Sequence, residues 1–152
     1  MDESLIETWT IHNRINLYLL GAIPDDALGA TLLRHRSVFQ LFAHCHNVRL
    51  MWLKASAPDL LAGLAKLEGK DGDCCDLEDA LTASGKAIEE LLRRSLAAGG
   101  KVKGFKPHAT AFAGYLISHE SHHRGQILWT LKDTGHPVDP KISYGLWEWG
   151  VR

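Results

Sequence analysis

Three histidines and a glutamate lie within five residues in the last third of the chain. The stretch His119-Glu120-Ser121-His122-His123 has the order H-E-x-x-H, in which two histidines four residues apart share one face of a helix. Such a pair can bind one metal ion, and in zinc metalloproteases the glutamate acts as a base. Three imidazoles suit zinc, nickel, iron or copper and leave a coordination position for water or substrate. The stretch therefore predicts a divalent-metal site, with its third ligand on another element.

Helical geometry separates the three histidines of this stretch. At about 100° per residue, His123 falls inside the apolar arc of its helix, His119 at the edge and His122 outside. Glu120 falls in the middle of the same arc, where a buried carboxylate needs a partner. Arg124 lies four residues further on, so we interpret the two as an internal ion pair. A role for Glu120 beside the metal, or in proton transfer, is the alternative.

The second group of histidines lies in FAHCHNVRLMWL, where His44 and His46 are both candidate ligands. His44 borders the main apolar face, beside Val48, and His46 lies on a weaker second stripe. Geometry alone favours His44 modestly. Cys45 falls within the apolar face and is expected to be a core residue.

A third polar group lies in IHNRINLYLL, where Asn13 and Asn16 fall on an apolar face and His12 at its edge. Buried polar groups must find hydrogen-bond partners. These side chains are therefore interpreted as a structural network within the core, or alternatively as the lining of a polar pocket.

The protease interpretation competes for the same histidines, but the sequence after the motif does not favour it. A protease of this class takes its third ligand downstream, and here the helix continues as RGQILW, with Glu148 the only later glutamate. We also find no strand that would hold an extended peptide.

Caps and periodicity predict the elements that must position these residues. Four helices are expected in a single domain over residues 1–152, which indicates an all-α four-helix bundle. The tail HPVDPKISYGLWEWG is expected to pack over one end of the bundle, or alternatively to form part of a dimer interface. The predicted helices cover residues 4–20, 37–56, 76–98 and 107–134.

Composition excludes several classes of protein. The 152 residues are 45% apolar and carry a net charge of −1, which argues against a nucleic-acid-binding protein. No apolar run reaches the roughly 20 residues of a membrane span. The acidic start, MDESLIE, is unlike a secretion signal. Three cysteines, with Cys74 and Cys75 adjacent in a loop expected to face solvent, argue against a disulfide framework and favour a cytoplasmic location.

Two of these stretches carry a resemblance to a known family. SHESHHRGQILWTL resembles the fourth-helix signature of the DinB/YfiT-like family of metalloenzymes, and FAHCHNVRLMWL resembles its second-helix signature. The resemblance implies an up-down-down-up four-helix bundle, often dimeric, that holds a divalent metal on three histidines. Because the family places a histidine eight residues before a tryptophan, here Trp52, the implied ligands are His44, His119 and His123. It assigns no role to Glu120, His12 or His122.

Two functions of different classes follow. The first is a metal-dependent enzyme that activates water or a thiolate, either a hydrolase or an S-transferase using a low-molecular-weight thiol, as in related branches of the family. Its substrate would be a small molecule, and Gln126, Glu120 and Asn13 are the candidate catalytic residues. The second is a non-catalytic, metal-binding stress or interaction protein. In either case we expect a homodimer.

Overall fold

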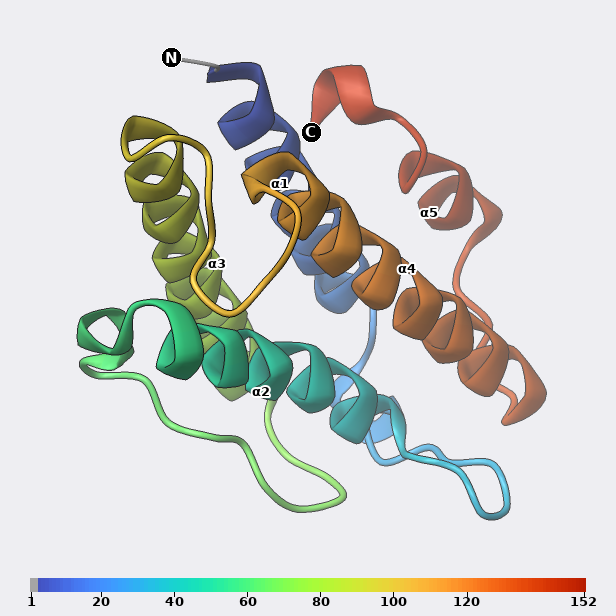
Figure 1. Cartoon of the computed structure of the whole chain (residues 1–152). Coiled ribbons are helices and arrows are strands. Elements are labelled where there is room, and N and C mark those ends of the chain that lie inside the picture. The colour runs from blue at the N-terminus through green and yellow to red at the C-terminus, as the bar shows by residue number, and fades with distance from the viewer. Residues whose placement is uncertain (1–2) are drawn as a thin grey trace.

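The computed structural model describes residues 3–152 and is built from helices (Figure 1). Within those residues no strand is present, and one isolated β-bridge joins Val102 to Phe105. The predicted all-α class is confirmed. The four long helices are α1 (Glu3–Gly21), α2 (Val38–Ser56), α3 (Cys74–Ala97) and α4 (Ala109–Asp133), followed by the short α5 (Pro140–Gly145). Three 3-10 turns accompany them at Asp25–Ala27, Pro58–Leu61 and Trp149–Val151.

Side-chain caps fix where the helices begin. Ser37 and Gln40 form a capping box at the start of α2, each bonding the other's backbone N–H. Asp73 caps α3 by accepting a hydrogen bond from the N–H of Cys75. The helix therefore starts earlier than predicted, and Cys74 and Cys75 lie in its first turn rather than in a solvent loop.

The cap of α4 is a histidine. His108 accepts a hydrogen bond from the N–H of Ala111 through Nδ1, at 3.1 Å. The helix consequently begins two residues later than the predicted start at Pro107. His108 is thereby accounted for as a structural residue.

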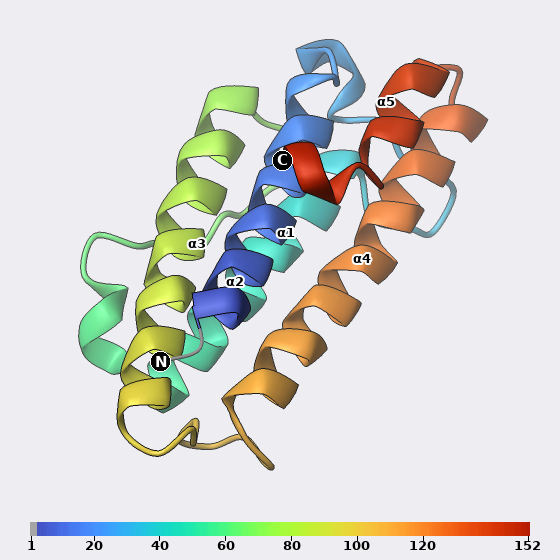
Figure 2. The same cartoon turned by 90° about the horizontal axis from the view of Figure 1, so that it is seen from above.

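Helices α1 and α2 each pack against both α3 and α4 (Figure 2). One close approach depends on a glycine in the middle of α3, because a Cβ at Gly85 would collide with the amide of Asn13. At the same contact between α1 and α3, Trp9 donates its indole N–H to the carbonyl of Gly85 at 2.9 Å. The glycine therefore costs some helix propensity but allows α1 to lie close to α3.

The core consists of two apolar clusters separated by a layer of buried polar side chains. Each long helix contributes apolar residues to both clusters. Along each of these helices, a buried polar residue separates the residues of one cluster from those of the other. On α1, for example, Trp9 belongs to one cluster, Ile15 to the other, and His12 lies between them. The buried members of the polar layer are His12, Asn16, Arg49, Ser84 and Glu120.

The C-terminal tail packs against the long helices through part of its length. Leu146 is buried in one apolar cluster, and the guanidinium of Arg152 lies 3.7 Å from the ring centre of Tyr18 on α1. Tyr144 and Trp147 are instead 75% and 79% exposed. The tail thus contributes to the core and also presents aromatic side chains at the surface.

No helix in the described part of the chain is both long and apolar enough to span a lipid bilayer.

Candidate metal centre

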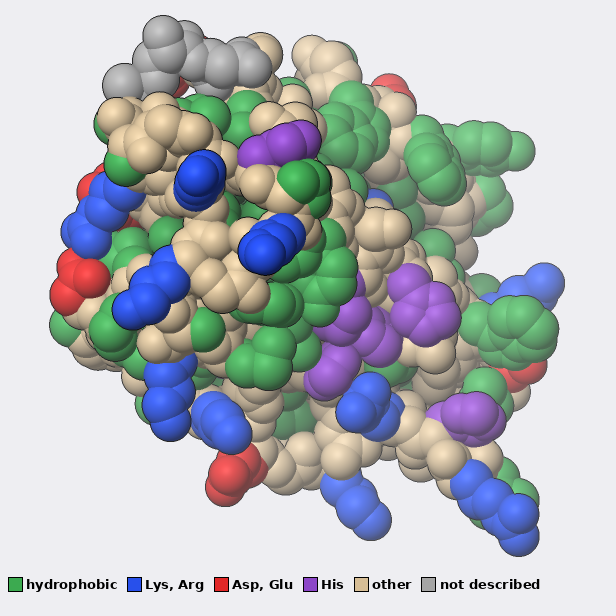
Figure 3. All heavy atoms as spheres, viewed as in Figure 1, with side chains coloured by type: hydrophobic (Ala, Val, Ile, Leu, Met, Phe, Trp, Pro, Cys, Tyr) green, Lys and Arg blue, Asp and Glu red, His purple; other side chains and the backbone are tan. Residues whose placement is uncertain are grey.

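Three histidine side chains meet where α2 and α4 lie side by side (Figure 3). The Nε2 atom of His119 lies 3.3 Å from Nε2 of His44 and 3.1 Å from Nε2 of His123. One nitrogen from each ring falls within 4.8 Å of the other two. The structure therefore brings together the three residues predicted as ligands, one from α2 and two from adjacent turns of α4.

The spacing of these nitrogens suits a shared cation. At zinc–nitrogen distances of about 2.0–2.1 Å, two ligands in tetrahedral geometry lie roughly 3.3 Å apart. The two measured Nε2 separations are close to that value. Among the described residues, no further His, Cys, Asp or Glu joins this group.

Gln126 fixes the protonation of one ring. Its Oε1 lies 2.7 Å from Nδ1 of His123, and an amide oxygen can only accept a hydrogen bond. Nδ1 of His123 therefore carries the ring proton, so Nε2 has a free lone pair that points toward the other two rings. This arrangement is the one that metal-binding histidines usually show.

Burial keeps the three imidazoles neutral. It lowers the pKa of His44 to about 4, with a further contribution from the positive charge of Arg36. Burial also lowers the pKa values of His119 and His123 from the ordinary 6.5. Because only unprotonated imidazole binds a metal, the site is ready for a cation at neutral pH.

His122 and His46 do not belong to this group of three. His122 is exposed, as predicted, and its ring meets the edge of His123 at 5.0 Å between centroids. His46 is buried and its Nε2 lies 2.8 Å from the carbonyl oxygen of Ala65, which gives it a structural role. The ring of Tyr115 stacks on that of His119, with the ring centroids 6.2 Å apart.

Glu120 is buried, as predicted, but the predicted partner is wrong. Its carboxylate is bound by Arg49 of α2, with Nε 2.8 Å from Oε2 and Nη2 2.6 Å from Oε1. Arg124 instead donates to Oδ1 of Asn16 at 2.7 Å. Burial on its own would raise the pKa of Glu120, but the charge and hydrogen bonds of Arg49 hold it well below the usual range.

The remaining polar residues of the layer complete this network, which decides between the two interpretations of the α1 side chains. Asn16 donates to Oε1 of Glu120 at 2.9 Å, and Nε2 of His12 lies 3.1 Å from the same oxygen. Asn13 accepts from Nη2 of Arg49 at 2.8 Å. These residues therefore form a hydrogen-bonded network within the core.

Sequence reasoning missed Arg49, although its place in HNVRLMWL indicates that it lies on the apolar face of the helix. At about 100° per residue, Arg49 falls roughly 140° from His44, inside the same apolar face as Cys45. An arginine in that position requires a buried anion, just as Glu120 requires a cation. The two residues lie on different helices, so spacing along one helix could not join them.

Comparison with known proteins gives one match. The model of the DinB family matches residues 1–149 of the chain. Neither a curated protein nor a solved structure matches it.

Proposed function

Because the chain belongs to the DinB family, we propose that it is an enzyme dependent on a divalent metal held by His44, His119 and His123. The observation that carries this proposal is the convergence of three neutral imidazole nitrogens at the junction of α2 and α4. Zinc, nickel and iron are the metals that best suit three such donors. The proposed fold is one domain, an up-down-down-up four-helix bundle.

A divalent ion at this site would supply Lewis acidity, lowering the pKa of a bound water to roughly 7 or stabilising a thiolate. Two reactions are thus proposed for a small-molecule substrate: hydrolysis, and transfer involving a low-molecular-weight thiol. Three protein ligands, rather than four, support both reactions because they leave a position for the reacting group.

The three candidate catalytic residues take different proposed roles. Gln126 is exposed at the edge of the centre and holds the ring of His123, so it is placed to meet a substrate as well as to orient a ligand. Glu120 and Asn13 bond Arg49 inside the core. We propose that these two are positioning residues, which hold α4 and α1 in place around the centre.

The direct test is elemental analysis of the purified protein before and after supplementation with zinc, nickel or iron. One ion per chain is expected, lost on chelation and restored with the ion. Ester hydrolysis and thiol-transfer assays with several low-molecular-weight thiols then separate the two reactions. A protein that never retains a stoichiometric divalent ion contradicts the proposal.

A non-catalytic function is the second candidate, and the exposed Tyr144 and Trp147 are the observation that favours it. Aromatic side chains are enriched in protein interfaces. We propose that they contribute to a cytoplasmic homodimer, which sedimentation of wild type and Trp147→Ser would test. A metal-binding protein inactive in every assay, yet dimeric through this surface, would support a stress or interaction role instead.

A further inference from the structure

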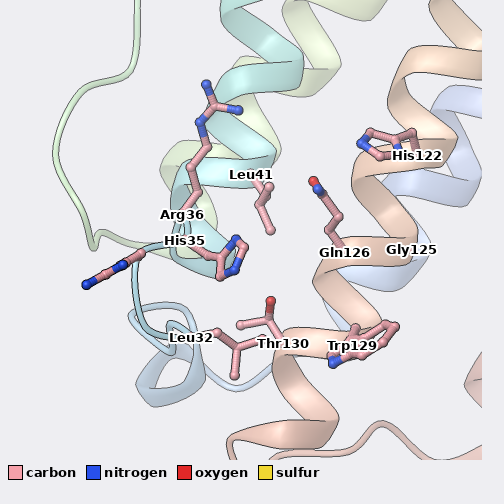
Figure 4. A pocket seen from close by; sticks show the side chains of 10 residues that line it. Leu32, His35, Arg36, Leu41, His122, Gly125, Gln126, Trp129 and Thr130 are labelled. Atoms are coloured by element: carbon pink, nitrogen blue, oxygen red, sulfur yellow. The ribbon is translucent and has the colours of Figure 1, made fainter.

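A pocket of about 750 Å³ opens beside the metal centre, between α4 and the segment that precedes α2 (Figure 4). Gln126 points into it from α4 and His35 faces it from the other side, while Arg36 and Trp129 also line it, with the Arg36 side chain running along α2. Gln126 joins the pocket to the centre, because the same amide accepts the hydrogen bond from His123. A molecule bound here would therefore contact Gln126, which is bonded in turn to His123, although none of the three candidate ligands lines the pocket itself.

The lining of this pocket is positively charged. Its charged residues are Arg34 and Arg36, and it includes no aspartate or glutamate. Neither Arg34 nor Arg36 forms an ion pair with any residue in the described part of the chain. The arginines of α3 behave differently, since Arg93 and Arg94 each bind two carboxylates.

The segment that carries these cations is held in a defined conformation. The hydroxyl of Thr31 donates to the carbonyl of His35 at 3.0 Å, and the N–H of Phe39 donates to the carbonyl of Leu28 at 2.8 Å. Between them, Arg34 adopts a left-handed backbone with φ of 65°. Glycine or asparagine would adopt this conformation more easily than arginine. Arg34 thus combines a left-handed backbone with a side chain that forms no ion pair among the described residues.

We propose that the pocket binds the anionic group of a small organic substrate, a carboxylate or a phosphate, through Arg34 and Arg36. The apolar part of that substrate would lie against Trp129 and Leu41, and its reacting group would face the histidines. Arginine suits this task because its planar fork of donors matches carboxylate and phosphate oxygens. The inference rests on the proposed function, since it names the class of substrate for the same centre.

The test uses metal-free protein, kept with a chelator, so that an anion cannot bind through the metal. Benzoate, phenyl phosphate and the neutral benzamide are titrated while NMR follows the indole N–H of Trp129 and the amide of Gly125. Both anions should shift these signals and bind roughly tenfold or more tightly than benzamide, because hydrogen bonds to charged groups are the stronger ones. Added salt should weaken the binding of the anions.

Two variants distinguish anion binding in the pocket from non-specific attraction of anions to the positive charges of the surface. In Arg34→Asn/Arg36→Gln, asparagine tolerates the left-handed backbone, and affinity for both anions should fall at least roughly tenfold. Lys101→Gln removes an exposed cation from the loop between α3 and α4 and should bind as wild type does. Equal binding of benzamide and benzoate, or wild-type affinity in the double variant, overturns the proposal.

The two proposals fail separately. A protein that binds these anions in the pocket but takes up no metal contradicts the metal-dependent function alone. A protein that takes up one metal per chain but binds neither anion contradicts the substrate class alone.

Discussion

The guanidinium of Arg49 donates two hydrogen bonds, of 2.8 and 2.6 Å, to the carboxylate of Glu120, and both side chains are fully excluded from solvent. Glu120 directly follows His119 in α4, and Arg49 lies in the same helix as His44. The ion pair therefore joins the two helices that supply the proposed ligands, on the core side of the centre.

Removing one partner of this pair should destabilise the fold severely. Arg49→Leu leaves the carboxylate buried without its cation, which costs on the order of 3–5 kcal/mol in the free energy of unfolding, measured by urea denaturation. Arg93→Leu is the matched control, because its ion pairs are exposed to solvent and its loss should change stability far less. The double variant Arg49→Leu/Glu120→Leu should recover part of the loss. Equal stability of Arg49→Leu and Arg93→Leu would contradict this account.

The three proposed ligands should be separable from the neighbouring histidine by substitution. His119→Ala should abolish stoichiometric metal binding while circular dichroism shows an intact helical fold, since the side chain is only partly buried. His122→Ala should retain the metal, because its ring is exposed and outside the group. Loss of metal in both variants, or in neither, would show that the ligand set is wrong.

Gln126 should tune the affinity of the centre without being required for it. Gln126→Ala removes the acceptor that orients His123, and such supporting residues are typically worth roughly 10–100-fold in metal affinity. Competition with a chromophoric chelator measures the change. An unchanged metal affinity would mean that the 2.7 Å contact does not constrain the ring.

Lowering the pH should destabilise the metal-free protein at pH values well above the usual pKa of carboxylates. Burial lowers the pKa values of His12 and His46, as it does those of the three candidate ligands, so below about pH 6.5 the unfolded chain binds protons that the folded chain does not. The free energy of unfolding should therefore fall as the pH is lowered from about 7 to 5, by up to roughly 1.4 kcal/mol per pH unit for each such histidine.

Urea denaturation at several pH values gives the slope. His46→Gln removes one of these five histidines and should make the dependence on pH shallower. Stability that stays level or rises on acidification would refute the prediction.

The sequence contained enough to predict the helices and the candidate ligands, because both depend on spacing within single helices. His119 and His123 follow from a four-residue step, and the burial of His123 follows from the apolar arc of α4. His44 required the family resemblance, since geometry barely separated it from His46.

Relationships between helices were harder to predict. The choice of Arg124 for Glu120 relied on the nearest opposite charge along the helix, whereas packing places Arg49 of α2 closer. The pocket likewise joins α4 to the segment before α2. Its cations, Arg34 and Arg36, lie in a turn without helical periodicity, where spacing predicts nothing about side-chain direction.

The polar layer between the two apolar clusters also limits how the helices can slide along one another. A shift of α4 by one helical turn would move its residues by about 5.4 Å along the helix axis. Glu120 would then leave Arg49 and face hydrocarbon, so this alternative alignment would be strongly disfavoured. His119 and His123 are carried on the same rigid helix. The buried charges thus select the one alignment in which the three histidines can meet.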